Sequence, residues 1–420
     1  MKLPFSVSKQ EIIIEKLVPG GQGIGTDSDG KKGFFWNVLP GELVTDYTIT
    51  KNKSHFFEAI AISTENSSKN RISPQDDCYL STSPWQIMDY DYELAQKKEL
   101  LAEVFHQNHV DISGFLDKTN VQTDGKMYHY RNKMEYSLYW DIEKSKIKLA
   151  FHKRGTHHKE PITSSSIERP EIYNMATQIV EGLNARHEEA RKYQSLLLRA
   201  NQSGEVSGGL YENHQPHPVF KNLNDTILGN EYSYSPNGFF QINLPVYEMA
   251  LVDIKQHITT NKVLDLYAGV GTIGLSVAND RELVLVENNK SAYAELEKNC
   301  QNVKLNDPRG LSPTPILSNS EEALDCIQPD QTVIVDPPRA GCDKKLIEKL
   351  LDAKPQKIIY LSCNPATQAR DVAILTGVNS PVDPISTQTF QQLYKIKSVI
   401  PYNFFPRTPH LENLVVLSLK

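Results

Sequence analysis

The sequence predicts an α/β protein whose C-terminal half is a doubly wound, Rossmann-like sheet, preceded by a small β-barrel and a central α+β region. From about residue 226 onward, apolar strand-like runs alternate with helix-like segments, which is typical of doubly wound folds. Residues 1–62 instead alternate short apolar runs with the glycine turns PGGQG, DSDGKKG and PGE, which is typical of a small barrel. We therefore expect three domains, at 1–62, 63–225 and 226–420.

The central region mixes predicted helices and strands behind a polar linker, STENSSKNRISPQDD. Apolar periodicity predicts one helix over 92–106 and a second over 172–193. The segment NQSGEVSGG has the composition of a turn that joins two strands. This mixture predicts an α+β domain between the barrel and the doubly wound sheet.

Length and composition exclude several classes of protein. A chain of 420 residues exceeds one hydrophobic core. The five cysteines, an odd number without paired spacing, favour a reducing compartment over a secreted disulfide scaffold. The N-terminal MKLPFSVSKQE interrupts any signal-peptide core with Pro, Ser and Lys, and no apolar run reaches membrane-spanning length. We expect a cytoplasmic monomer without a membrane partner.

The run LDLYAGVGTIG at 264–274 predicts a strand, a tight turn and a helix. Gly269, Gly271 and Gly274 fit the GxGxxG spacing, in which glycines let the backbone approach a ligand and the helix N-terminus offers free N–H groups. Glu287 closes the next apolar run, where a carboxylate can hold the two ribose hydroxyls of a nucleotide. Alone, the pattern leaves open a nicotinamide-dependent oxidoreductase, or a turn that only packs a helix on the sheet.

The run VIVDPPRAG at 333–341 predicts a strand that ends at Asp336, where two prolines fix the turn. A carboxylate held there can accept a hydrogen bond from the edge of a base. The alternative is a strand-ending turn with a surface Asp. Because ligands of open α/β sheets collect outside the carboxyl ends of the strands, we expect this turn to face the glycine turn.

The run IIYLSCNPAT at 358–367 places Cys363 at a third strand end, directly before a predicted helix start at Pro365. A helix N-terminus lowers the pKa of a thiol, so we expect Cys363 to be a covalent nucleophile in the same crevice. One alternative is a buried structural cysteine. The other is Cys342, which follows the DPPRAG run and lacks the position at a strand end.

These runs belong to an ordered series of motifs: IIIEKLVPGGQGIG, YRNKMEYSLY, NGFFQIN, DLYAGVGTIG, VDPPRAG, LSCNPAT and FPRTPHLENLVVL. Over nearly its whole length the chain resembles the class I RNA 5-methyluridine methyltransferases, in the branch with an N-terminal TRAM domain that includes enzymes of 23S rRNA. Asp265, four residues before the first glycine of the turn, resembles the S-adenosylmethionine version of that turn. The resemblance implies methyl transfer from S-adenosylmethionine to carbon 5 of a uridine in structured RNA.

The resemblance also implies the site residues. Gln241, Tyr267, Glu287 and Asp336 would contact S-adenosylmethionine or the target base. Cys363 would add to carbon 6 of uracil, because carbon 5 is not nucleophilic enough to take a methyl group directly. Glu412, which opens the final apolar strand, would then remove the proton from carbon 5.

The sequence departs from the family pattern at two places. Many relatives hold a four-iron cluster on four cysteines before the PWQ motif, whereas here only Cys78 is available and Ser83 stands where the last of the close group would fall. We therefore predict no iron–sulfur cluster, and no other metal site. Cys300 and Cys326 show no metal-ligand spacing. Asn403 stands where the family usually has an Asp, which puts an auxiliary role of that acid in doubt.

The predicted partner is RNA, although the net charge of −6 does not itself favour a polyanion. From Lys126 to Glu160, nine Lys and Arg stand against four Asp and Glu, with aromatic residues interleaved, and such segments suit phosphates and unstacked bases. A solvated charged hairpin is the alternative. The barrel favours 23S rRNA over tRNA. A non-catalytic RNA-binding protein would have no reason to keep Asp336, Cys363 and Glu412 together.

Overall fold

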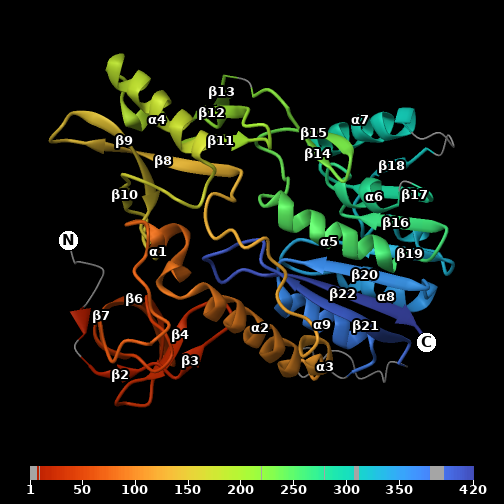
Figure 1. Cartoon of the computed structure of the whole chain (residues 1–420), viewed down its shortest axis with the longest axis horizontal. Helices are drawn as coiled ribbons and strands as arrows, with labels where there is room; N and C mark the ends of the chain where they lie inside the picture. The colour runs from red at the N-terminus through yellow and green to blue at the C-terminus, as the bar shows by residue number, and fades with distance from the viewer. Residues whose placement is uncertain (1–6, 9, 219, 279, 307–311, 379–391) are drawn as a thin grey trace.

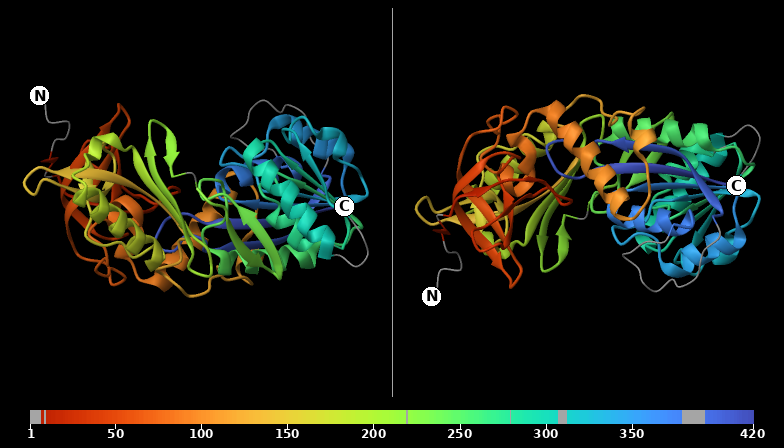
Figure 2. Two further views of the ribbon diagram at one scale, coloured as in Figure 1. Left: turned by 90° about the horizontal axis from the view of Figure 1, so that it is seen from above. Right: turned by 90° about the horizontal axis from the view of Figure 1, so that it is seen from below.

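The computed structural model describes residues 7–8, 10–218, 220–278, 280–306, 312–378 and 392–420. In these ranges the chain forms an N-terminal sheet, a central sheet and a C-terminal sheet, with a short hairpin beside the last (Figure 1). Figure 2 shows an elongated molecule, with the N-terminal and central sheets at one end and the C-terminal sheet at the other.

The N-terminal sheet has the strand order β1-β6-β7-β5-β4-β3, with β2 paired to β6. Its centre is an aromatic cluster in which Phe35 meets Tyr47 and Phe57 edge to face, with ring centroids 5.2 and 5.5 Å apart. These rings are buried, so the apolar runs predicted from the sequence do form the core of this part. The strands are β1 (Val7–Ser8), β2 (Ile12–Ile13), β3 (Lys16–Leu17), β4 (Gly23–Thr26), β5 (Lys32–Trp36), β6 (Leu43–Asn52) and β7 (Phe56–Glu65).

Short helices follow the N-terminal sheet. They are α1 (Tyr79–Thr82), the 3-10 helix η1 (Pro84–Ile87), α2 (Tyr90–Gln107) and α3 (Ser113–Leu116). The start of α2 is fixed by Asp89, whose carboxylate accepts hydrogen bonds from the backbone N–H groups of Asp91 and Tyr92. No helix in the described ranges has the length and apolar character needed to cross a membrane.

The central sheet has the order β10-β9-β8-β11-β12-β13, all pairs antiparallel, and α4 packs on it. As predicted, the polar turn after residue 200 joins two of its strands. The elements are β8 (Lys133–Asp141), β9 (Lys146–His152), β10 (Lys159–Pro161), α4 (Pro170–Ala185), the 3-10 helix η2 (Ala190–Lys192), β11 (Ser195–Ala200), β12 (Val206–Glu212) and β13 (Gln215–His217).

The predicted helix 172–193 was wrong at its C-terminal end, because α4 stops at Ala185. His187 adopts a left-handed backbone conformation with φ of 55°, which an α-helix cannot continue through. The segment that follows, HEEARKY, offers few apolar residues for a helical face, and tertiary packing of such a face supplies most of the stability of a helix.

The C-terminal sheet has the order β18-β17-β16-β19-β20-β22-β21. Its strands are parallel up to β20, and β22 then runs antiparallel to both β20 and β21. This is the doubly wound arrangement predicted from the sequence, closed by a reversed hairpin. The strands are β16 (Lys262–Leu266), β17 (Glu282–Glu287), β18 (Thr314–Leu317), β19 (Gln331–Val335), β20 (Lys357–Ser362), β21 (Tyr394–Tyr402) and β22 (Glu412–Leu419).

Helices cover both faces of the C-terminal sheet. Successive residues of a strand point to opposite faces, and accordingly Val263 and Leu264 lie in two different hydrophobic clusters. One face carries the hairpin β14 (Leu223–Ile227) and β15 (Asn230–Tyr234), then α5 (Leu244–His257), α6 (Thr272–Val277) and α7 (Lys290–Asn306). The other carries α2, α3, α8 (Lys344–Ala353) and α9 (Pro365–Leu375), with a further 3-10 turn, η3 (Leu324–Cys326).

The position of α2 differs from the predicted division into domains. Leu101, Val104 and Phe105 pack in the same hydrophobic cluster as the C-terminal sheet, although the sequence analysis placed this helix in the region 63–225. The predicted boundary at 225 also falls inside β14. Sequence order alone could not show this, because α2 crosses from the first part of the chain to cover a sheet formed by the last (Figure 1).

Candidate active site

The carboxyl ends of neighbouring strands bring the predicted residues to one edge of the C-terminal sheet. In the parallel register, Leu266 pairs with both Val286 and Val335, so the next residues, Tyr267, Glu287 and Asp336, are neighbours at that edge.

The remaining two predicted residues meet through the antiparallel strand. Ser362 at the end of β20 pairs with Asn413 in β22. The next residue along β20, Cys363, therefore comes opposite Glu412, at the same edge of the sheet as the parallel strand ends. The two residues are brought together by the pairing of β20 with β22, and not by the local sequence around either of them.

These residues line one cavity of about 1710 Å³. All six predicted site residues contribute to its wall: Gln241, Tyr267, Glu287, Asp336, Cys363 and Glu412. Sites for single small ligands usually enclose about 300–1,000 Å³. The cavity therefore has room for two ligands side by side.

The glycine turn after β16 is open toward the cavity. Tyr267 has a φ of 62°, Gly269 of 58° and Gly271 of 90°, so the chain makes a tight left-handed turn that only glycine adopts without cost. A Cβ atom added to Gly269 would meet no atom within 4 Å. Glu287 braces this turn, because its Oε2 accepts the Gly269 N–H at 2.8 Å.

Asp265 lies beneath the turn and is absent from the residues that line the cavity. Its Oδ2 accepts the N–H of Gly274 at 2.8 Å, and a Cβ on that glycine would approach the same oxygen within 2.8 Å. Burial raises the pKa of Asp265 to about 7, and the charges of Asp336 and Glu287 add to that effect. Asp265 therefore ties the start of α6 to β16.

Asp336 and Glu412 form a coupled acidic pair. Burial raises the pKa of Asp336 to about 7. Burial, and then the charge of Asp336, raises the pKa of Glu412 well above its usual range. Glu412 is 4 % exposed, and its Oε2 has no hydrogen-bond partner among the described residues. A buried carboxyl oxygen without a partner is uncommon, and a role in the chemistry of a site is one physical reason for it.

The predicted pKa of Cys363 was wrong in direction. Its backbone does lie at a helix N-terminus, since α9 begins at Pro365 with Asn364 as its cap. Burial, together with the charges of the nearby Glu412 and Asp336, nevertheless raises the pKa of the Cys363 thiol to about 11. The free site therefore holds Cys363 as a thiol.

Cys342, the alternative nucleophile, also lines the cavity but is 5 % exposed. Burial, and then the charge of Asp371, raises the pKa of its thiol. Cys363 is half-buried and is the more accessible of the two.

Arg339 is the arginine of the DPPR turn, and no role was predicted for it from the sequence. Its charge favours the ionised forms of both Cys363 and Glu412. Its backbone carbonyl accepts hydrogen bonds from the Asn364 side chain at 2.7 Å and from Thr367 at 3.2 Å. The DPPR turn is thus fastened to the start of α9, beside the thiol.

Gln241 reaches the cavity from the loop between β15 and α5. Its side-chain amide makes no hydrogen bond to another described residue, while its backbone carbonyl accepts the Asn132 side chain at 2.9 Å. A buried amide without a protein partner is free to bind a ligand. His410 also lines the cavity, although it was not predicted from the sequence. Its ring is exposed, and the ring centroid lies 5.9 Å from that of Phe405.

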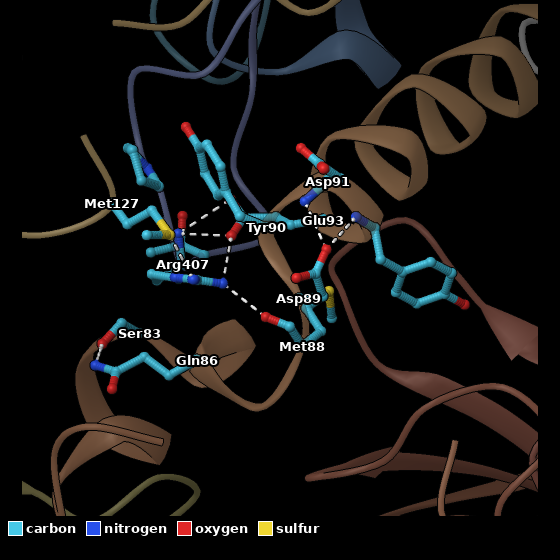
Figure 3. Close-up of polar contacts among 12 residues, drawn as sticks. Ser83, Gln86, Met88, Asp89, Tyr90, Asp91, Glu93, Met127 and Arg407 are labelled. Atoms are coloured by element: carbon cyan, nitrogen blue, oxygen red, sulfur yellow. Dashed lines mark hydrogen bonds and ion pairs between the residues drawn. The ribbon is translucent and has the colours of Figure 1, made fainter. Parts of the chain in front are cut away.

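The loop from Asn403 to Thr408, which leads to Glu412, is held by buried charges on α2. Glu93 and Lys97 form an ion pair at 2.9 Å with both side chains fully buried. Glu93 accepts the backbone N–H of Arg407 at 3.0 Å, and Lys97 donates to the Phe405 carbonyl at 3.0 Å. Figure 3 shows the Arg407 side chain beside Tyr90, Glu93 and Met127, with its guanidinium donating to the Met88 carbonyl at 2.6 Å.

Asn403 belongs to this buried cluster and is not among the residues that line the cavity. Its Oδ1 accepts from Lys97 at 2.5 Å and its Nδ2 donates to Glu93 at 3.2 Å. An amide suits this place because its two ends meet charges of opposite sign. In this chain the residue therefore holds the loop rather than taking part in a reaction.

The described residues contain no group of three or more His, Cys, Asp or Glu side chains that could hold a metal ion. Cys78, the one cysteine near the position of the family cluster, is buried, with its Sγ 3.8 Å from the Ser164 carbonyl. The absence of an iron–sulfur cluster stays a prediction.

Comparisons with known proteins support the resemblance. Residues 323–420 match the family described as tRNA (uracil-5-)-methyltransferase. A protein of Bacillus anthracis named an uncharacterized RNA methyltransferase is 26 % identical, over 97 % of this chain and 96 % of its own. One of Listeria monocytogenes with the same description is 27 % identical, over 97 % of both chains.

A solved structure shows the same fold. The tRNA (uracil-54, C5)-methyltransferase of Pyrococcus abyssi, in complex with S-adenosyl-L-homocysteine, aligns with a TM-score of 0.73 and 21 % identity, over 97 % of this chain and 99 % of its own. The predicted resemblance to RNA uracil-5 methyltransferases is confirmed. The chain is thus similar to RNA methyltransferases over nearly its whole length, and this likeness argues against a nicotinamide-dependent oxidoreductase.

The position of Arg339 predicts the titration of Cys363. Arg339→Met should raise the pKa of the Cys363 thiol above its value of about 11, because the cation that favours the thiolate is removed. The alkylation rate of Cys363 by iodoacetamide, followed by mass spectrometry against pH, should then rise at higher pH than in the wild type. Arg339→Lys keeps the charge and is the control. An unchanged profile in Arg339→Met would show that this charge does not reach the thiol.

The buried pair on α2 predicts a large effect on stability. Lys97→Met should lower the free energy of unfolding by about 3–5 kcal/mol, because Glu93 would remain buried without its nearest cation, and Arg407 lies farther away at 3.6 Å. Lys98→Met, at the next position of the same helix, should change it by less than about 0.5 kcal/mol. Denaturant titration of both variants is the measurement, and equal stabilities would contradict the role given to Lys97.

Proposed function

We propose that the protein transfers a methyl group from S-adenosylmethionine to carbon 5 of a uridine in structured RNA, through a covalent bond between Cys363 and carbon 6 of the base. The observation that carries the proposal is the pair formed by Cys363 and Glu412 across the β20–β22 register, with Asp336 in the same cavity. A nucleophile, a base and room for two ligands are what this reaction requires.

S-adenosylmethionine is the cofactor, in keeping with the methyltransferase family and with the S-adenosyl-L-homocysteine bound to the archaeal relative. The residues at the glycine turn fit it. Each oxygen of Glu287 accepts one backbone N–H, from Gly269 or Asn289, and retains a lone pair for a ribose hydroxyl. We propose that Gln241, Tyr267, Glu287 and Asp336 hold the cofactor or the base. When bound, the cofactor supplies an electrophilic methyl group.

In the first step the Cys363 thiol gives its proton to water and the sulfur adds to carbon 6 of the uracil. The carbon 5–carbon 6 double bond breaks, and its electron pair makes carbon 5 nucleophilic enough to take the methyl group. The bond between that methyl group and the sulfonium sulfur would break, and the donor would leave as S-adenosyl-L-homocysteine. Arg339 favours the thiolate that this addition requires. The elevated pKa of about 11 keeps the sulfur protonated until the base arrives.

In the second step Glu412 removes the proton from carbon 5. The electrons of that C–H bond restore the double bond, and the carbon 6–sulfur bond breaks to release Cys363. A carboxyl group with a raised pKa is a stronger base once it is ionised, so the burial of Glu412 serves proton removal. Its unpartnered Oε2 is the atom proposed to take the proton.

The remaining parts of the chain are proposed to bind RNA. We propose residues 1–62 as a TRAM barrel, residues 63–225 as a central RNA-recognition domain and residues 226–420 as the methyltransferase domain. All five cysteines fall in described ranges and are free thiols, which supports a reducing, cytoplasmic setting. We propose that the enzyme acts as a monomer.

Ribosomal 23S RNA is the proposed substrate, and tRNA is the second candidate. The preference for ribosomal RNA rests on the N-terminal barrel alone. The tRNA (uracil-54, C5)-methyltransferase of Pyrococcus abyssi aligns over 97 % of this chain, the N-terminal region included for the most part, and this favours the second candidate. Mass mapping of 5-methyluridine in both RNAs from a strain that lacks the gene decides between them.

The nucleophile is tested by Cys363→Ala. This variant should lose turnover and still bind S-adenosylmethionine, because the sulfur acts on the base. RNA that carries 5-fluorouridine should trap the wild type covalently, since fluorine cannot leave as a proton does. Cys326→Ala, outside the cavity, is the control and should behave as the wild type. A trapped peptide that contains Cys342 would refute the assignment.

The base is tested by Glu412→Gln. Addition of Cys363 and methyl transfer both precede proton loss, so this variant should accumulate a covalent, already methylated complex of enzyme and RNA. Denaturing electrophoresis with a labelled methyl donor would detect it. Glu322→Gln removes an exposed carboxylate outside the cavity wall and is the control. Normal release of methylated RNA by Glu412→Gln would move the role to another group.

A further inference from the structure

The cavity is lined by groups of opposite charge that come from different parts of the fold. Carboxylates on the C-terminal sheet and its helices line one side, among them Glu287, Glu321 and Asp336. The wall that the central sheet contributes is lined by Lys133 at the start of β8, by Arg131 two residues before it, and by Arg199 in β11. This group is called the cationic wall below. None of the roles proposed for the reaction uses it.

Acidic side chains near the cationic wall favour the charged forms of two of its members, Asp225 and Glu295 for Arg199 and Glu135 for Lys133, but they do so without direct contact. Within the described ranges, no Asp or Glu forms an ion pair with Arg131, Lys133 or Arg199. Burial, with the charges of Arg199 and Arg131, lowers the pKa of Lys133 to about 8. Neighbouring cations that repel one another cost stability unless an anion binds between them.

Arg199 fixes the floor of the wall. The residue is 1 % exposed, and its guanidinium lies over the rings of Tyr234 and Phe240 at 5.5 and 6.0 Å. It donates to the carbonyls of Gly238 and Phe240 at 3.3 and 3.1 Å, while its Nε has no hydrogen-bond partner among the described residues. The guanidinium therefore keeps its positive charge at the floor of the wall, held in place by two aromatic rings and two backbone carbonyls.

Arg131 supplies the free donors. Its Nε donates to the Lys133 carbonyl at 2.9 Å, which holds the stem of the side chain. The two terminal nitrogens donate to no other described residue, so the planar end of the guanidinium is available to a ligand in the cavity. Such a planar fork matches two oxygens of a phosphate.

Lys133 links the wall to the loop that carries Gln241. Its Nζ donates to the carbonyls of Asn237 and Gly238 at 3.0 and 3.2 Å. An anion bound at the wall would therefore contact the same loop that presents Gln241 to the cavity. The anionic group of a ligand and the part of it that lies near Gln241 would then be bound by neighbouring residues.

We propose that the cationic wall binds a backbone phosphate of the RNA next to the target uridine, with Arg131 as its main contact. The proposal rests on the proposed function. A nucleotide is the ligand that places a phosphate within a few ångströms of a base, and the cavity has room for it beside the cofactor. Phosphate contacts fix the register of a nucleic acid and leave base selection to other groups.

The test is Arg131→Gln in the full-length enzyme, with a minimal RNA substrate. The affinity for RNA should fall about tenfold in low salt. The slope of the logarithm of the affinity against that of the salt concentration should become shallower by about 0.7–0.9, which is the loss of one phosphate contact. KM should rise with kcat nearly unchanged, and affinity for S-adenosylmethionine should not change. Arg131→Lys should recover part of the affinity.

Lys255→Gln is the matched control, because it removes one positive charge from the exposed surface of α5, outside the cavity. A second arm uses wild-type enzyme and RNA with a neutral methylphosphonate at a single linkage, moved one position at a time around the target. One linkage should weaken binding in the wild type and have no further effect in Arg131→Gln.

The failure of this proposal is distinguishable from failure of the proposed function. If the wild type methylates uridine in RNA and Arg131→Gln keeps both its affinity and its salt slope, the phosphate site is refuted alone. The phosphate site is also refuted if every methylphosphonate weakens binding as much in Arg131→Gln as in the wild type. If the wild type methylates no RNA, the proposed function fails first.

Discussion

The active site depends on the reversed strand β22, which lies between β20 and β21. Parallel strands alone would bring Glu287, Tyr267 and Asp336 together, and this is enough to bind a nucleotide-like cofactor. The antiparallel register between Ser362 and Asn413 adds a carboxyl group beside the thiol of Cys363. A one-residue slip of β22 would turn Glu412 to the opposite face of the sheet.

That register is secured at the beginning of β22 by charges that are costly to bury. Glu93 and Lys97 on α2 both bond to the loop before Glu412, and Arg407 within that loop lies 3.6 Å from Glu93; all three are nearly fully buried. The N-terminal sheet reaches the same loop, since a Cβ on Gly21 would come within 2.2 Å of Pro409, and the Trp85 ring donates to the Gly21 carbonyl at 3.0 Å. The loop is thus a joint between the first, middle and last parts of the chain.

Features determined by neighbouring residues could be predicted from the sequence. The glycine turn, the strand end at Asp336 and the helix start after Cys363 depend on a few adjacent residues, and each has the expected local structure. The pKa of Cys363 could not be predicted in the same way. Its direction depends on Glu412 and Asp336, which are near in space and distant in the sequence.

Long-range placement explains the other differences. Arg199 stands in the apolar run SLLLRA, where nothing local marks it as part of a cavity wall. The helix α2 has a sequence that fits any amphipathic helix, and only the tertiary structure assigns it to the C-terminal sheet. Asp265 was singled out for its place before the glycine turn, and its hydrogen bond to Gly274, which ties β16 to α6, depends on a residue nine positions away. In each case the sequence shows the type of residue, but not the residues that surround it in the folded protein.

The arrangement of charge gives the free enzyme an unreactive site. With the pKa of Cys363 near 11 and the Asp336–Glu412 pair raised by burial, the sulfur carries its proton at neutral pH and at least one of the two carboxyl groups retains its own. A buried thiolate without a substrate would be open to oxidation. The acidic pair belongs to the C-terminal sheet and the cationic wall to the central sheet. The groups proposed to react and the groups proposed to bind the RNA therefore come from two different sheets. Only a substrate that contacts both sheets would bring together all the groups proposed for binding and reaction.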